Sequence, residues 1–217
     1  MARKAVPALL FYAFFFMPSL SEFAEFFSAS PAIPAVYSTL EALLDAFIVY
    51  LPLTALLLSP PARRFICGGI SQKNGIDWQA LFAEGFLGFL CLCAAAFAAS
   101  NFSEALGDFG GVASLLPEEG ESGAAICLML AAGAALEETF FRYFLISSFE
   151  AAGLGSLLSS LLSIFLFAVP HIWEGLGGVL NALLAGFILS ALYIRRRSLP
   201  PLILAHALYN ITAFVLG

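Results

Sequence analysis

Three charged side chains interrupt a long apolar run in the string EETFFR: Glu137, Glu138 and Arg142. On insertion scales each such charge costs about 3 kcal/mol at the centre of a bilayer, so a helix that carries three needs a partner or a purpose for them. Glu138 and Arg142 are four residues apart and share a helix face, where they can form an ion pair. Glu137 is rotated from them by about 100° and is left free of that pair. Glu137 is therefore the candidate reactive carboxylate, suited to take a proton from water and return it to a leaving group.

The two histidines of the chain also lie in apolar segments. His171 ends the string FAVPH, and His206 begins the string HALYN, which places Asn210 one turn later on the same helix face. A lone histidine in such a segment is more often a hydrogen-bonded core residue than a catalytic one. Two of them beside a double glutamate favour a site. Two imidazoles can bind a metal or hold and polarise a water molecule, and an amide can donate to a developing oxyanion.

The composition says where such a site must lie. Of the 217 residues, 61% are hydrophobic and 11% charged, and the mean hydropathy is +0.96. A soluble domain is about 45–50% apolar and about 25% charged, so this chain must use lipid as part of its solvent. The net charge of −6 leaves no basic face for phosphates, which excludes nucleic acid as a partner. The four cysteines show no paired ligand spacing and are interpreted as core residues.

Apolar runs of about 20 residues between turn signals predict an all-α fold, a polytopic transmembrane helical bundle of about seven spans, with six to eight as the range. The spans are expected at about 5–20, 37–59, 79–100, 123–149, 153–172, 176–194 and 199–217. The loops are too short for a second domain, so residues 1–217 form a single integral membrane domain in this interpretation.

Basic residues in the short loops set the expected orientation. With seven spans they all fall on one side of the membrane: Arg3, Lys4, Arg63, Arg64, Lys73, Arg195, Arg196 and Arg197. The loops at about 21–36 and 101–122 carry acidic residues and no Lys or Arg, as expected for the other side. We expect a multi-pass protein of the cytoplasmic membrane of a prokaryote, with a cytoplasmic N-terminus.

The three motifs together resemble a known family. EETFFR matches EExxxR, the segment Phe167 to His171 matches FxxxH, and the segment His206 to Asn210 matches HxxxN of the CAAX protease and bacteriocin-processing (CPBP, or Abi) family of intramembrane proteases. Each motif alone is weak, but all three in this order on apolar segments form a specific signature. The resemblance covers a catalytic core of about 123–217, and the earlier residues match only in being hydrophobic.

The resemblance implies a peptidase related to the type II endopeptidase that removes the last three residues of prenylated CAAX proteins. Its substrate would be a membrane-associated protein or peptide, prenylated or C-terminally anchored. By the resemblance, Glu137 is the general base, His171 helps to position the water, His206 and Asn210 stabilise the oxyanion, and Glu138 with Arg142 braces the site.

The family has been described both as metalloproteases and as metal-free glutamate proteases. The zincin helix HExxH is absent, but Glu137, His171 and His206 could form a site for one divalent metal such as zinc, with an open position for water. The interpretation here favours metal-free chemistry and no certain cofactor. Two rival functions remain: a proton-coupled transporter, and a non-catalytic bacteriocin-immunity or membrane binding protein.

One part of the geometry is discordant. At about 1.5 Å per residue, Glu137 and His206 come out level with each other, whereas His171 comes out near the outer surface. Either the fourth span bends, or the fifth is displaced or tilted. Pro170 should kink the end of the fifth span and place His171 on a turn. Asn181 is expected to form an interhelical hydrogen bond, and Gly175, Gly177 and Gly178 a turn.

Overall fold

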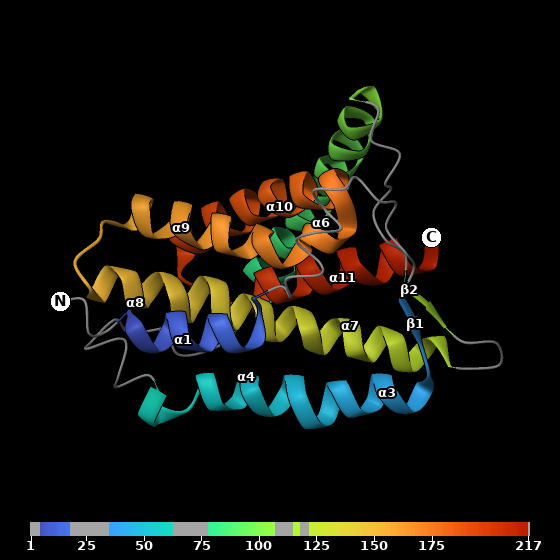
Figure 1. Ribbon diagram of the computed structural model, residues 1–217. Coiled ribbons are helices and arrows are strands. Elements are labelled where there is room, and N and C mark those ends of the chain that lie inside the picture. Colours follow the sequence, from blue (N-terminus) through green and yellow to red (C-terminus); the bar gives the residue numbers. More distant parts are fainter. Residues whose placement is uncertain (1–4, 18–34, 63–77, 107–114, 118–121, 217) are drawn as a thin grey trace.

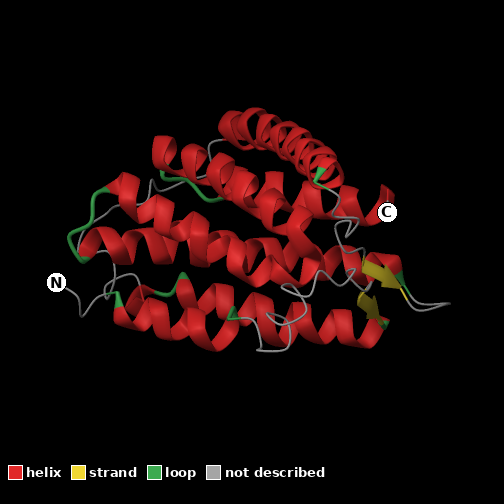
Figure 2. Cartoon of the chain, turned by 45° about the horizontal axis from the view of Figure 1, so that its top comes forward, coloured by secondary structure: helices red, strands yellow, loops and turns green. Residues whose placement is uncertain are grey.

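The computed structural model describes residues 5–17, 35–62, 78–106, 115–117 and 122–216. These residues form a bundle of helices with one pair of short strands at one end (Figure 1, Figure 2). The elements are α1 Val6–Phe15, β1 Ala35–Tyr37, α3 Thr39–Leu44, η2 Asp45–Tyr50, α4 Leu51–Leu57, α6 Trp78–Ala105, β2 Leu115–Pro117, α7 Gly123–Glu137, η3 Glu138–Leu145, α8 Ile146–Ala151, α9 Ser156–Ala168, η4 Val169–Glu174, α10 Gly175–Arg196 and α11 Pro200–Leu216. The prediction of an all-α membrane bundle is confirmed.

Four stretches of the described chain are long and apolar enough to cross a membrane: Thr39–Leu57, Leu81–Ala105, Gly123–Ala151 and Ser156–Arg196. The last of them is a hairpin, since α9 and α10 pack against each other on either side of η4. With the shorter apolar helices α1 and α11, seven helical segments correspond to the seven predicted spans.

The α9–α10 hairpin turns back before it reaches the end of the bundle at which α7 begins (Figure 1). A helix of 13 residues such as α9 is about 20 Å long, too short for a hydrocarbon core of about 30 Å. The turn is made by the 3₁₀ segment η4 and by Gly175, whose φ of 77° favours glycine. Gly177 and Gly178 lie inside α10, so the prediction that they belong to the turn is wrong.

The segment α7–η3–α8 is the most buried of the four long stretches. Its middle part, η3, is a π-helix and contains most of the string EETFFR. Aromatic rings of α1 cover it: Phe11 stacks on Phe140 with ring centroids 5.0 Å apart. Phe140 and Phe141 are 0% and 1% exposed, so they pack in the core of the bundle rather than against lipid. The charged motif therefore lies at the centre of the bundle.

The strands tie two parallel segments together at their starts. β1 precedes α3, β2 precedes α7, and the two strands pair in parallel with Ala35 opposite Leu115. The backbone N–H of Ser122 also donates to the hydroxyl of Thr39 at 2.8 Å. α3–η2–α4 consequently runs beside α7 in the same direction (Figure 1). The sequence did not predict this strand pair.

Ion pairs join helix ends where α10 finishes. Arg197 contacts the Glu150 carboxylate through two nitrogens, at 2.8 and 2.5 Å. Arg196 contacts Glu84 of α6 at 2.6 Å. The end of α10 and the start of α6 therefore lie at the same end of the bundle, as the distribution of basic residues predicted.

The predicted loop at 101–122 begins later than expected, because α6 continues to Ala105. Other residues used to predict the orientation lie outside the described residues, and the cytoplasmic N-terminus stays a prediction. They are Arg3, Lys4, Arg63, Arg64, Lys73 and the acidic residues Glu22, Glu25, Asp108, Glu118, Glu119 and Glu121.

A serine of α9 fastens the π-helix to its neighbour. The Ser163 hydroxyl, 1% exposed, donates to the carbonyl of Phe141 at 2.7 Å. We expect Ser163→Ala to lower the free energy of unfolding by about 1 kcal/mol, since the carbonyl loses a buried partner. Thermal unfolding in detergent would measure this. Ser160→Ala is the matched control, because the Ser160 hydroxyl donates to the carbonyl of Ser156 within α9 and its loss should have less effect. Equal destabilisation by the two variants would show that the hydrogen bond from Ser163 to Phe141 does not stabilise the packing of α9 on η3.

Candidate active site

Glu138 opens the π-helix η3 and is fully buried. Its Oε2 lies 3.2 Å from Nε of Arg142, so the ion pair predicted from their spacing is confirmed. The guanidinium of Arg142 is also buried and lies over the ring of Phe167, 4.3 Å from its centroid. A cation on an aromatic face retains part of the stabilisation that burial removes. Glu138 and Arg142 thus form a charge-balanced unit inside the bundle.

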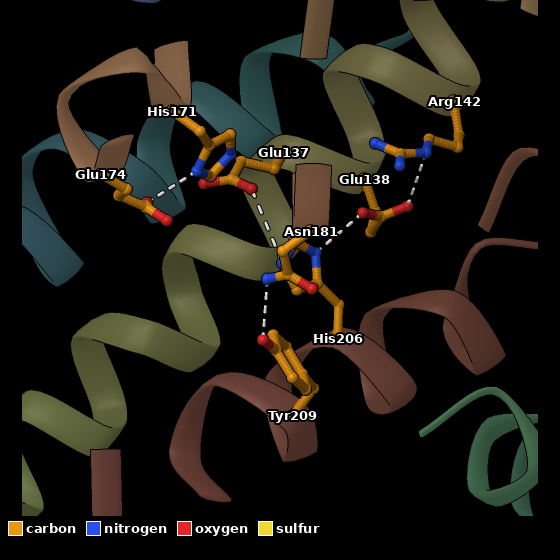
Figure 3. Close-up of polar contacts among 8 residues, drawn as sticks. All are labelled: Glu137, Glu138, Arg142, His171, Glu174, Asn181, His206 and Tyr209. Carbon is orange, nitrogen blue, oxygen red and sulfur yellow. Dashed lines mark hydrogen bonds and ion pairs between the residues drawn. The ribbon is translucent and has the colours of Figure 1, made fainter. Parts of the chain in front are cut away.

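His206 of α11 connects the two glutamates (Figure 3). Its Nδ1 lies 2.8 Å from Oε1 of Glu138, and its Nε2 lies 3.8 Å from Oε2 of Glu137. The imidazole is only 6% exposed, whereas the Glu137 side chain is 27% exposed. Glu138 therefore has two partners, and Glu137 is the more accessible carboxylate, which agrees with its prediction as the residue outside the ion pair.

His171 lies on η4, directly after Pro170, so the prediction that it sits on a turn is confirmed. Its Nδ1 is 2.8 Å from Oε1 of Glu174, and its ring lies within electrostatic reach of Glu137 (Figure 3). The level estimated for it from a straight helix, far from Glu137, is wrong because the α9–α10 hairpin turns within the bundle. The three segments that carry the motifs thus meet in one place.

Comparison with known families identifies this region. Residues 120–212 match the family described as type II CAAX prenyl endopeptidase Rce1-like. This part of the chain is similar to the Rce1-like family. The resemblance drawn from the three motifs is thereby confirmed, and all six candidate residues fall inside the matched region. Neither the search of curated proteins nor that of solved structures found a match.

The Rce1-like family is a protease family, and the apolar helices make the protein an integral membrane protein. A protease family of this kind implies, in general, a membrane-associated protein as substrate. The matched region begins just before α7 and ends within α11, so it covers α7 to α10 and most of α11. α1, α3, η2, α4 and α6 lie outside it, and they enclose the site by packing on η3, α7 and α11.

Asn210 is the candidate that the geometry of the Rce1-like core joins least firmly to the others. It is half-buried on α11, one turn after His206, and its side chain forms no hydrogen bond to another described residue. Its neighbour Tyr209 accepts a hydrogen bond from Nδ2 of Asn181 at 2.8 Å. The interhelical bond predicted for Asn181 is confirmed, here between α10 and α11.

The geometry of the site bears on whether it could hold a metal ion. Among the described residues, no three His, Cys, Asp or Glu side chains gather so that they could hold a metal ion. The arrangement of Glu137, His171 and His206 in this structure does not fit a three-ligand zinc site, which needs all three donors at about 2.0–2.2 Å from one point.

Two contacts of the site were not predicted: His206 with Glu138, and His171 with Glu174. The first depends on how α11 docks, which the sequence does not specify. The second had a local signal, because residues three apart eclipse each other on a 3₁₀ helix, and Pro170 marked the segment as irregular.

Proposed function

We propose that the protein is an intramembrane endopeptidase in which Glu137 activates the water that attacks a peptide bond. The observation that carries this proposal is that the two glutamates differ in burial and in contacts. Glu138 is fully buried against Arg142 and His206, whereas Glu137 is partly exposed and faces two imidazoles. The separation of 3.8 Å between Glu137 and His206 exceeds a direct hydrogen bond and suits a shared water molecule.

In the proposed reaction, Glu137 takes a proton from water as the oxygen attacks the substrate carbonyl carbon. His206 and Asn210 are the donors to the resulting oxyanion. Because Nδ1 of His206 faces Glu138, the ring can donate through Nε2 as well only in its doubly protonated form. Glu137 then gives its proton to the amide nitrogen, the C–N bond breaks, and an acid and an amine leave.

As substrate we propose a prenylated or C-terminally anchored chain, because such a chain is held beside the bilayer where these helices lie. The carboxylate and imidazole groups can bind substrate backbone that would otherwise lack hydrogen-bond partners in lipid. We further propose that the reaction needs no metal. Purified protein freed of divalent ions should keep its activity, and loss restored by zinc alone would overturn this point.

The clustering of polar groups favours a protease over a proton-coupled transporter. A transporter needs ionisable groups spread along a path through the membrane. Here Glu84, the first charged residue of α6, pairs with Arg196 at the basic end of the bundle. The remaining charges of η3, η4 and α11 meet in one site.

The experiment compares the termini of membrane and secreted proteins from native cells that express the natural protein, Glu137→Gln or Glu84→Gln at equal levels. A protease predicts that specific termini disappear with Glu137→Gln and persist with Glu84→Gln. If all termini agree, and Glu137→Gln rescues the defect of a complete deletion, the protein instead has a binding or immunity role.

A further inference from the structure

A third carboxylate borders the site outside all three motifs. Glu174 is the last residue of η4, three positions after His171, and its Oε1 lies 2.8 Å from Nδ1 of that histidine. The Glu174 and His171 side chains are 13% and 25% exposed, so water competes little for this contact. Figure 3 shows Glu174 approaching the imidazole from the side away from His206.

Two glycines make room for Glu174. Gly175 directly follows it with a φ of 77°, which lets the chain turn from η4 into α10. A Cβ atom on Gly178 would lie 2.2 Å from Cβ of Glu174 and 2.8 Å from its Oε2. Any side chain at position 178 would therefore push Glu174 from its place. The local sequence is arranged to keep this carboxylate against the start of α10.

We propose that Glu174 is a positioning residue that holds His171 with its proton on Nδ1. An ionised carboxylate can only accept a hydrogen bond, so the nitrogen that faces it must carry the hydrogen. In the neutral ring Nε2 is then left with its lone pair and can accept a hydrogen bond from a water molecule. This role rests on the proposed function, because the water in question is the one that Glu137 activates.

The arrangement orients the attacking water. A water that donates one hydrogen to Glu137 and the other to Nε2 of His171 keeps an oxygen lone pair free for the substrate carbonyl, even when it also accepts from His206. With the proton on Nε2 instead, the ring would compete with the water as a donor to Glu137. Each histidine of the site thus has a carboxylate at Nδ1, Glu138 for His206 and Glu174 for His171. Such a partner fixes both the tautomer and the ring orientation.

The first test needs no substrate. The chain contains two histidines, so ¹⁵N-histidine labelling gives two imidazoles, and His206→Gln assigns them. We expect the ¹⁵N shifts of His171 in the detergent-solubilised protein to show the hydrogen on Nδ1. Glu174→Gln should keep that tautomer, since the amide oxygen still accepts, whereas Glu174→Leu should abolish it. A His171 ring with its hydrogen on Nε2 in the natural protein, or one unaffected by Glu174→Leu, overturns the proposal.

The second test uses a fluorogenic farnesylated CAAX peptide. Glu174→Leu and Gly178→Ala should each lower kcat by about 10- to 100-fold with little change in KM, and Glu174→Gln should restore most of the activity. Gly133→Ala is the matched control, because a Cβ there meets only Tyr50 at an ordinary 3.5 Å. Full activity of Glu174→Leu refutes the role of Glu174. Full activity of Glu137→Gln refutes the proposed function instead, and leaves the tautomer result to decide this inference.

Discussion

Glu137→Gln should lower kcat by at least about 100-fold while the unfolding midpoint of the protein stays the same. A general base contributes about 10²- to 10⁴-fold to a rate, and an amide cannot take a proton from water. The fold should tolerate the change because Gln is nearly isosteric with Glu and Glu137 lies outside the Glu138–Arg142 pair. Cleavage of a farnesylated CAAX peptide and thermal unfolding in the same detergent would measure the two quantities.

Glu84→Gln is the matched control for that experiment. Glu84 is also a half-buried glutamate on an apolar helix, but its partner is Arg196 at the end of the bundle, 2.6 Å away. Glu84→Gln should leave kcat unchanged and lower stability by about 1 kcal/mol at most, the usual limit for a partly exposed pair. A Glu137→Gln protein that cleaves the peptide at the natural rate would remove Glu137 from the role of base.

The sequence predicted the parts of the site that depend on local spacing. The lengths of the apolar runs predicted seven helical segments, and the four-residue spacing of Glu138 and Arg142 predicted their pairing. The interhelical bond of Asn181 followed from a lone amide in an apolar helix, although its partner Tyr209 could not be named. Each of these depends on helix geometry that any apolar sequence shares.

The parts that could not be predicted depend on contacts between distant segments. The sequence predicts the wrong depth for His171 because residues 153–172 have the length of a full span, whereas the hairpin of α9 and α10 turns inside the bundle. The π-helix η3 likewise has no signature in its own residues. The Ser163 hydroxyl of α9 supplies the carbonyl of Phe141 with a partner, which is a tertiary contact. Strand pairing between Ala35 and Leu115 joins residues 80 positions apart.

The burial of each charged residue determines how much its substitution lowers the stability of the fold. Glu137 is 27% exposed and can change to a neutral residue without stranding a partner, whereas Arg142 is 0% exposed beside a fully buried Glu138. Substitutions within the string EETFFR should therefore have separate effects. A change of Glu137 should lower the catalytic rate, and a change of Arg142 should lower the stability of the folded protein.

Arg142→Ala should lower the free energy of unfolding by about 3–5 kcal/mol, which is the usual cost of removing one partner of a buried ion pair. Glu138 would keep its charge without the guanidinium 3.2 Å away, and Phe167 would lose the cation over its ring. The measurement is the yield of folded, monodisperse protein in detergent together with its thermal unfolding.

Two further variants separate charge stranding from loss of packing. Arg196→Ala removes a 42% exposed arginine and should cost about 1 kcal/mol or less. The double variant Arg142→Met with Glu138→Gln removes both charges and keeps the volume, so it should recover much of the stability lost in Arg142→Ala. Activity should remain low in the double variant, because a neutral amide replaces the charged carboxylate that faces Nδ1 of His206. Equal yields of folded Arg142→Ala and natural protein would show that the pair does not stabilise the fold, and the bracing role of Arg142 would then be wrong.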